Sequence, residues 1–220
     1  MESVAGYVRK YKLDGILSAD LVGALRLLRK APGELLIRAD DRVRDLLFFV
    51  EGRAKVYRTM ENGKNLLATF YMPFDVLGDV EIFALERYTM NVEALTETVC
   101  LSLPFALVKK AADRNARLFM YLCGRLGTKL AERITAASVN LRYPVENRLA
   151  SYLLAGTDGE GLVLGTDNLG ELADFLGTSY RQLARVVRRF RAAGVMDRTR
   201  GRIRVLNRAK LAPLARDLYA

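Results

Sequence analysis

The sequence predicts an α+β protein made of a jelly roll (a double-stranded β-helix), a long helix and a winged helix-turn-helix, in that order. Three observations support this fold class. Short apolar runs separated by turn signals fill residues 33–104, and helical periodicity without proline follows over 105–141. A helix, a glycine turn, a second helix and two short strands then occupy 166–206.

The composition limits the classes of function. The chain has 220 residues, 51% of them hydrophobic, which is enough to bury the core of one large or two modest domains. Histidine is absent, and this excludes His-ligated haem, His-based zinc sites and His-dependent catalytic triads. The two cysteines, Cys100 and Cys123, form no CxxC pattern, so we expect no zinc site and no disulfide framework. No metal or cofactor is therefore expected.

The sequence also bears on location. Residues 1–15 mix charged residues and glycine without an apolar centre, so no signal peptide is predicted. No run approaches the roughly 18 apolar residues that a membrane helix needs. The use of cysteine is compatible with a reducing compartment. We expect a cytoplasmic protein without a membrane partner.

A helix is expected ahead of the β domain, within residues 1–30. Leu17, Leu21, Leu25 and Leu28 recur at spacings of three and four, which places them on one helix face. Ser18 can cap the start of this helix. The segment KAPGE at 30–34 then ends it.

Residues 33–104 contain five apolar or alternating runs typical of strands, at 34–38, 45–52, 54–59, 66–71 and 99–104. The pair Asn62-Gly63 favours a hairpin, because both positions of a type I′ turn need positive φ and both residues tolerate it. Short, closely spaced strands favour a sandwich or barrel, and a double-sheet jelly roll limits the number of exposed edges.

Residues 105–140 show helical texture. Because a helix of this length offers more apolar face than one small β domain covers, we interpret the surplus as a seam between two copies, most simply in a two-fold dimer. Packing within one chain is the alternative, since the four-residue spacing is not a clean heptad. The predicted seam consists of Leu118, Leu122, Leu126, Leu130 and Ile134.

A hinge is predicted at LRYPVEN, residues 141–147. Pro144 disfavours continuing the helix through Tyr143, and proline fits the first turn of a following helix. The expected domains are 1–104 for the β-roll with its leading helix, 105–143 for the dimerisation helix and hinge, and 144–220 for the winged helix-turn-helix.

The net charge of +10 is confined to one end of the chain. Residues 178–220 hold 12 basic and 2 acidic residues, whereas residues 1–177 hold 23 of each. Such asymmetry indicates a basic domain that faces a polyanion, and nucleic acid is the commonest one. A solvated basic surface without a partner is the alternative.

The charged segment has the pattern of a DNA-binding unit. The stretch 166–177 is a short helix, GTS at 177–179 is a turn, and the second helix runs to Gly194, a suitable C′ residue. The inner face of this second helix, with Leu183, Val186, Val187 and Phe190, is expected to pack on the first. Its outer N-terminal residues are expected to reach base edges in the major groove of double-stranded DNA. These are Ser179, Tyr180, Arg181, Gln182 and Arg185.

The residue types suit two kinds of contact. Arginine can donate two hydrogen bonds to guanine, and glutamine can pair with adenine in the same way. Other arginines are expected to contact phosphates, which fixes the register without reading sequence. These are Arg188, Arg189, Arg198, Arg200 and Arg202.

With these segments in place, the sequence resembles the CRP/FNR family of bacterial transcription regulators over nearly its whole length. The most specific pieces are FFVEGRAKVY (48–57), PFDVLGDVEIF (73–83) and LADFLGTSYRQLARVVRRFRAAGVMDR (172–198). The resemblance implies a cyclic-nucleotide-binding-like β-roll and a homodimer on a two-fold symmetric operator. It also implies control by a β-roll effector and contact with RNA polymerase.

The effector region departs from the family pattern. The family's Gly-Glu-Leu segment corresponds to Gly78, Asp79 and Val80, and its phosphate-binding Arg-Ser pair falls on Tyr88 and Thr89. The base-contacting Thr-Ser pair on the dimer helix falls on Arg133 and Ile134. Since a neutral phenol cannot pair with a phosphate as a guanidinium does, we do not expect cyclic AMP to bind. These seven residues are the candidates for the effector pocket.

The recognition helix departs as well. The family often has Ser-Arg-Glu-Thr-Val-x-Arg, and the matching residues here are 179–185. Arg185 keeps the family's most dependable base contact, whereas Tyr180 and Arg181 replace Arg and Glu. Because an acidic acceptor for cytosine becomes a cationic donor, we expect a different half-site.

Two rival functions were weighed. An enzyme on a β-roll usually needs histidine ligands, and the sequence contains neither these nor a phosphate loop or nucleophile elbow, so no enzyme is expected. A sensing module that acts through protein partners, with little DNA binding, remains the alternative. The sequence does not identify the effector, the operator or the direction of regulation, nor does it assign a redox role to either cysteine.

Overall fold

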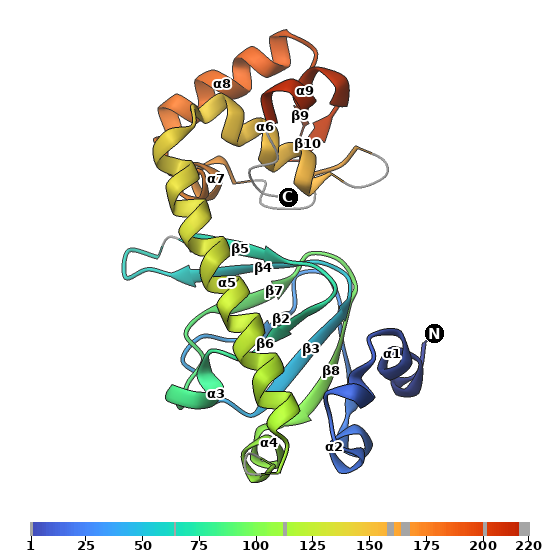
Figure 1. Cartoon of the computed structure of the whole chain (residues 1–220). Coiled ribbons are helices and arrows are strands. Elements are labelled where there is room, and N and C mark those ends of the chain that lie inside the picture. Colours follow the sequence, from blue (N-terminus) through green and yellow to red (C-terminus); the bar gives the residue numbers. More distant parts are fainter. Residues whose placement is uncertain are drawn as a thin grey trace. The chain divides into compact units, whose positions relative to one another are not determined.

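The computed structural model describes residues 2–63, 65–111, 114–157, 161–163, 168–199 and 202–215, with the backbone alone for 83, 84, 133 and 136–141. The chain forms two compact units. The first comprises 1–58 and 70–130, and the second comprises 59–69 and 131–220. Each is described separately below, and Figure 1 labels the elements.

Short helical segments lead into the first unit. They are α1 (Val4–Lys10), a 3₁₀ turn (Leu13–Gly15) and α2 (Ala19–Ala24). Leu17, Leu21 and Leu25 are buried, as the spacing predicts, but the helix ends at Ala24. The residues that follow form strand β1 (Arg26–Lys30), in which Leu28 pairs with Cys100. The predicted continuation of the helix through Leu28 is therefore wrong, because pairing with another strand overrides the local periodicity.

The β-roll consists of two four-stranded sheets. The first has the order β1-β8-β3-β6, with β3 (Asp45–Glu51), β6 (Asp75–Leu77) and β8 (Thr98–Pro104). The second has the order β2-β7-β4-β5, with β2 (Leu35–Ile37), β4 (Ala54–Thr59), β5 (Asn65–Tyr71) and β7 (Asn91–Ala94). The sequence analysis anticipated five of these strands and missed the short β6 and β7 as well as β1.

Strand β3 is buried on both faces. Leu46, Phe48 and Val50 join the apolar cluster that the helices cover, while Leu47 and Phe49 alternate with them and are equally buried. A continuous apolar run is what a strand covered on both sides requires. Strand β3 therefore lies at the centre of the first unit. The loops that carry the candidate pocket begin or end at strands of the two sheets.

The predicted helix over 105–140 is two helices. α4 (Phe105–Lys110) is separated from α5 (Ala116–Arg142) by a short connection, within which 112 and 113 lie outside the described residues. The side chain of Asn115 accepts a hydrogen bond from the Leu118 amide at 3.2 Å and so caps the start of α5. A small helix, α3 (Glu81–Ala84), lies between β6 and β7.

The second unit contains the predicted winged helix-turn-helix. Its helices are α6 (Val145–Gly156), α7 (Leu169–Phe175), α8 (Tyr180–Ala192) and α9 (Arg208–Ala215). The wing is the antiparallel pair β9 (Met196–Thr199) and β10 (Arg202–Val205), and Leu162 adds a further bridge to Arg204. α6 begins directly after Pro144, as proline's fixed φ allows.

Candidate nucleic-acid interface and effector pocket

Helix α8 is held by one apolar face and one cap. The hydroxyl of Ser179 accepts a hydrogen bond from the Gln182 amide at 3.2 Å, which satisfies one of the unpaired N–H groups of the first turn. The side chains expected to face inward are all buried, namely Leu183, Val186, Val187 and Phe190. The helix is therefore fixed in place from one side, and the opposite side is left to solvent.

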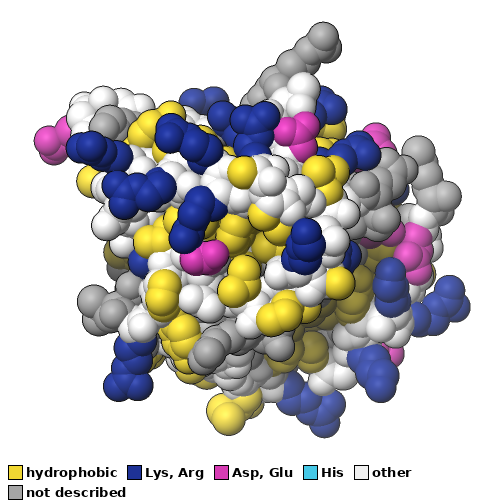
Figure 2. Space-filling view, turned by 90° about the horizontal axis from the view of Figure 1, so that it is seen from above, with side chains coloured by type: hydrophobic (Ala, Val, Ile, Leu, Met, Phe, Trp, Pro, Cys, Tyr) yellow, Lys and Arg dark blue, Asp and Glu magenta, His cyan; other side chains and the backbone are white. Residues whose placement is uncertain are grey.

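The outward side of α8 is strongly basic. Tyr180 is 60% exposed, and Arg181, Gln182, Arg185 and Arg188 are also exposed. The helix contains no acidic residue. Figure 2 shows Lys and Arg side chains spread over the face seen from above, with few acidic ones between them. Such a surface attracts a polyanion.

Two of the arginines on α8 have carboxylate partners. Arg189 pairs with Glu146 of α6 at 2.6 Å, and Arg191 pairs with Asp197 of β9 at 3.3 Å. For Arg181, Arg185 and Arg188, no carboxylate lies within 4.0 Å among the described residues. The expected phosphate contact of Arg189 would therefore have to compete with Glu146.

A buried arginine fixes the turn before α8. Arg148 of α6 is 6% exposed and donates hydrogen bonds to the carbonyls of Leu176 and Gly177, where α7 ends. Gly177 has φ +59°, which glycine adopts without strain. The sequence analysis missed Arg148. Its signal is a lone cation on the apolar side of a helix, at a spacing of four from the buried Tyr152.

The wing carries the remaining arginines. Arg202 is exposed, Arg198 is half-buried, and Arg200 lies outside the described residues. The Thr199 hydroxyl and the Arg198 backbone, together with Arg191, lower the pKa of Asp197, so this carboxylate stays ionised. Among the described residues of the wing, Arg202 and Arg204 are the exposed arginines.

The Gly78-Asp79-Val80 segment is tied to α5. The Asp79 side chain is buried and pairs with Lys129 at 2.9 Å, and Lys129 also pairs with Asp75 at 3.2 Å. Arg125 adds a second cation 3.0 Å from Asp75. Burial raises the pKa of Asp79, while Lys129 opposes that shift. Asp79 is thus engaged by the protein itself, and the sequence analysis did not anticipate Lys129.

Tyr88 and Thr89, the equivalents of the family's phosphate-binding Arg-Ser pair, are both bonded to other groups of the chain. Tyr88 is buried, and its hydroxyl donates to the Asp45 carbonyl at 2.9 Å, so the ring anchors the loop to β3. Burial also raises the pKa of this phenol. The amide and hydroxyl of Thr89 both donate to the buried Glu81, at 3.1 and 2.9 Å. A carboxylate of the chain therefore holds the donors that an external anion would use.

The remaining candidates for the effector pocket are Val80, Arg133 and Ile134. Val80 is 50% exposed and Ile134 is 61% exposed, whereas the side chain of Arg133 lies outside the described part of the chain.

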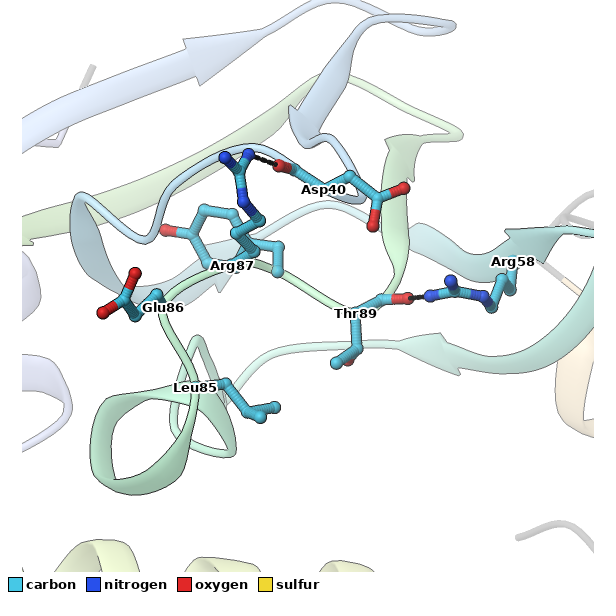
Figure 3. A pocket seen from close by; sticks show the side chains of 7 residues that line it. Asp40, Arg58, Leu85, Glu86, Arg87 and Thr89 are labelled. Carbon is cyan, nitrogen blue, oxygen red and sulfur yellow. Dashed lines mark hydrogen bonds between the residues drawn. The ribbon is translucent and has the colours of Figure 1, made fainter.

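A hollow of about 370 Å³ opens beside this loop. Figure 3 shows its lining side chains, with Asp40 and Arg58 on one side and Glu86 on the other. Arg58 of β4 donates to the Thr89 carbonyl, and Arg87 donates to the Asp40 carbonyl. Its lining residues are Asp40, Arg58, Leu85, Glu86, Arg87, Tyr88 and Thr89. Sequence reasoning found two of these seven, because the pocket joins segments far apart in the chain.

The predicted seam on α5 divides into two parts. Leu118 and Leu122 are fully buried in the core of the β-roll, so neither can contact a partner helix. Leu130 and Ile134 are more than 60% exposed, and Leu126 is half-buried. A different stripe is exposed along the helix at alternating spacings of four and three. It consists of Met120, Gly124, Gly127, Ala131 and Ile134.

The described residues contain no cluster of three or more metal-ligating side chains. None of their helices combines the length and the apolar character needed to cross a bilayer.

Comparison with protein families gives two matches. A cyclic nucleotide-binding domain model matches residues 27–115, and a Crp-like helix-turn-helix domain model matches residues 147–214. Regulatory protein YeiL of Escherichia coli O157:H7 is 26% identical over 199 residues, which is 90% of each chain. The anaerobic regulatory protein of Aggregatibacter actinomycetemcomitans is 22% identical and covers 85% of this chain and 76% of its own.

Solved structures show the same fold. A transcriptional regulator of the CRP/FNR family from Eubacterium rectale superposes with a TM-score of 0.77 at 20% identity, over 93% of this chain and 97% of its own. FixK2 from Bradyrhizobium japonicum superposes with a TM-score of 0.66 at 18% identity, over 87% and 97%.

Proposed function

The chain belongs to the CRP/FNR family of transcription regulators, and we infer from this that it acts as a homodimer on a two-fold symmetric DNA site. It has an effector-binding β domain and a DNA-binding helix-turn-helix, and its family is one of regulators rather than enzymes. We place its action in the cytoplasm, with RNA polymerase as the partner that the family implies.

The observation that carries DNA binding is the outward face of α8. Arg181, Arg185 and Arg188 are exposed and lie beyond 4.0 Å of any described carboxylate, on a helix whose other side is anchored. A helix of this kind fits the major groove, with its N-terminal residues on base edges. Arg185 is assigned to a guanine and Gln182 to an adenine, although the amide oxygen of Gln182 accepts a bond from Thr178 at 2.8 Å and must exchange it.

The surface of α5 supports the homodimer. The exposed stripe from Met120 to Ile134 has the alternating spacing of a coiled-coil seam, unlike the four-residue series in the sequence analysis. Its two glycines, Gly124 and Gly127, cost the helix about 1 kcal/mol each relative to alanine. Yet a Cβ at either position would meet nothing within 4 Å in this chain. The close approach of a second α5 gives a reason for glycine at two positions where packing within the single chain does not require it.

The β-roll is assigned to sensing, and cyclic AMP is not the favoured signal. Glu81 already occupies the donors of Thr89, and Tyr88 stands where the family's phosphate-binding arginine is expected. Both features work against a cyclic phosphate bound in the usual way.

The decisive experiment is selection of bound duplexes from a random pool, combined with mass measurement in solution. We expect a palindromic site whose half-sites lie about 34 Å apart, bound by a dimer, with affinity falling steeply as salt rises. If no duplex is enriched and binding at moderate salt is absent, the protein acts through protein partners instead.

A matched pair of variants tests the dimer. Gly127→Glu places a charge on the exposed stripe, whereas Thr128→Glu places one at the next exposed position, about 100° around the helix. Both substitutions replace an exposed residue with a good helix former, so folding should survive. We expect Gly127→Glu to give monomers and Thr128→Glu to remain dimeric. Dimers in both would overturn the proposed seam.

A further inference from the structure

The hollow beside Tyr88 has walls that the protein holds in place by itself. The Asp40 amide donates to the Tyr88 carbonyl at 2.8 Å, and the Tyr88 amide donates to the Asp41 carbonyl at 2.9 Å. Glu81 accepts a hydrogen bond from the Thr89 hydroxyl, and the Tyr88 hydroxyl fixes the loop to β3. A site that is already formed binds a ligand without the cost of ordering its loops.

The hollow is lined by charges of both signs. Arg58, Arg87, Asp40 and Glu86 belong to its lining residues, and all four are exposed. None of the four forms an ion pair within 4.0 Å with any described residue; the two guanidiniums bond backbone carbonyls instead. Opposite charges that line one space without pairing favour a ligand that carries both charges.

Figure 3 separates the two acidic residues. The Asp40 carboxylate is turned to the same side as the Arg58 guanidinium, whereas the Glu86 carboxylate is turned away from both. Asp40 has φ +67°, a conformation that Asp and Asn tolerate better than other side chains do. The fold therefore holds this carboxylate at a position few residue types could occupy.

We propose that this hollow binds a small zwitterion of the α-amino acid type as the effector of the β-roll. The ligand's carboxylate is bound by Arg58, its ammonium by Asp40, and its side chain lies against Leu85. The volume of about 370 Å³ is within the range of small-molecule sites. This inference rests on the proposed function, in which the β-roll is the sensing domain, and it names the class of ligand.

A simple anion suits the hollow less well. Asp40 would repel it, and the donors of Thr89 are occupied by the buried Glu81. An amine without a carboxylate would leave Arg58 without an anionic partner. A ligand with both groups complements Arg58 and Asp40 at the same time.

The test is thermal unfolding of the full chain with a panel of α-amino acids. The comparison compounds are the matching amines, the matching deaminated acids, inorganic phosphate and cyclic AMP. At about 100 times its dissociation constant, a ligand that binds only the folded protein should raise the melting temperature by about 5 °C or more. We expect this from one or a few amino acids and from none of the comparison compounds.

Variants then locate the site. Asp40→Asn keeps a residue that tolerates the backbone conformation, and Arg58→Gln keeps a hydrogen-bond donor for Thr89; each should abolish the shift. Glu86→Gln is the control with the same change of charge on the far side, and it should retain at least half of the shift. A response equal in Asp40→Asn and wild type, a response to phosphate or cyclic AMP alone, or no response to any amino acid would overturn the proposal.

The outcome of the ligand test does not depend on whether the protein binds DNA. Selection of duplexes in the absence of any ligand tests the regulator itself, so a protein that binds an operator but no amino acid refutes only the ligand class. A protein that binds an amino acid but no duplex refutes the regulator and leaves the site in place.

Discussion

Basic residues perform opposite tasks in the two units of the molecule. In the first unit, Lys129 and Arg125 of α5 lie within 3.2 Å of Asp75 or Asp79, and the Lys129 side chain is only 13% exposed. On α8, Arg181, Arg185 and Arg188 are exposed and lie beyond ion-pair distance of any described carboxylate. The first set is neutralised within the chain, whereas the second keeps its charge available to a partner.

The contrast shows that the role of a basic residue depends less on how many charges surround it in the sequence than on whether it forms an ion pair. Residues 1–177 hold as many acidic as basic residues, and the described ion pairs of the roll lie within this balanced part. Burying a cation is tolerated only where an anion and hydrogen bonds accompany it. Leaving arginines unpaired and in water costs little, and their field then acts on a polyanion.

The largest effect is expected from removing the buried cation. Lys129→Met leaves Asp79 and Asp75 without this partner in a buried site, and the free energy of unfolding should fall by about 3–5 kcal/mol. Urea denaturation of the purified protein measures it.

Lys30→Met is the control for that loss. Lys30 pairs with Glu34 at 3.4 Å on the surface, and such exposed pairs contribute about 0–1 kcal/mol. A similar loss in both variants would show that Lys129 is no more than a surface ion pair.

The second effect concerns the unpaired set. Arg185→Ala should weaken binding to the selected DNA site by about 1–3 kcal/mol and relax the preference at one base pair, with little change in stability. Titration against the selected duplex and against a duplex altered at that base measures both. An equal loss on specific and random DNA would mean that Arg185 contacts only phosphate.

Long, periodic features could be predicted from the sequence, and pairings between distant segments could not. The inward face of α8 is a local pattern, so its residues could be named in advance. The predicted type I′ turn at Asn62-Gly63 is wrong, because Gly63 has φ +74° but Asn62 does not have the positive φ that this turn type needs. Leu28 was misplaced because its strand is fixed by β8, some 70 residues away along the chain. A local helix pattern carries no information about that partner.

The candidate sites show the same difference between local patterns and pairings of distant segments. Arg185 was found because the basic helix is a single segment, whereas the pocket combines Asp40, Arg58 and the 85–89 loop. The seam on α5 was assigned to a four-residue series that includes Leu118 and Leu122, which the roll buries. Periodicity identified an apolar helix, but only the fold shows which face is already covered.

A smaller effect is expected at the wing. Arg202→Ala removes an exposed charge next to the segment that the structure does not describe, and it should weaken binding to specific and random duplexes alike. The slope of log affinity against log salt should decrease in magnitude by about 1. Affinities measured at three or more salt concentrations give that slope. A loss confined to the selected site would contradict the assignment to phosphate.

The smallest effect is expected at Arg189, which is exposed on the basic helix but also has a carboxylate partner. Arg189 lies on the basic helix but pairs with Glu146 at 2.6 Å, so this carboxylate competes with DNA phosphate for the same guanidinium. Glu146→Gln should strengthen binding to random duplex by up to about threefold, since an exposed pair is worth less than about 1 kcal/mol. Asp174→Asn removes one negative charge from the exposed side of α7 and serves as the control. If both variants strengthen binding equally, the gain reflects the change in net charge and not the release of Arg189 from Glu146. Arg189 would then belong with the basic residues that are neutralised within the chain.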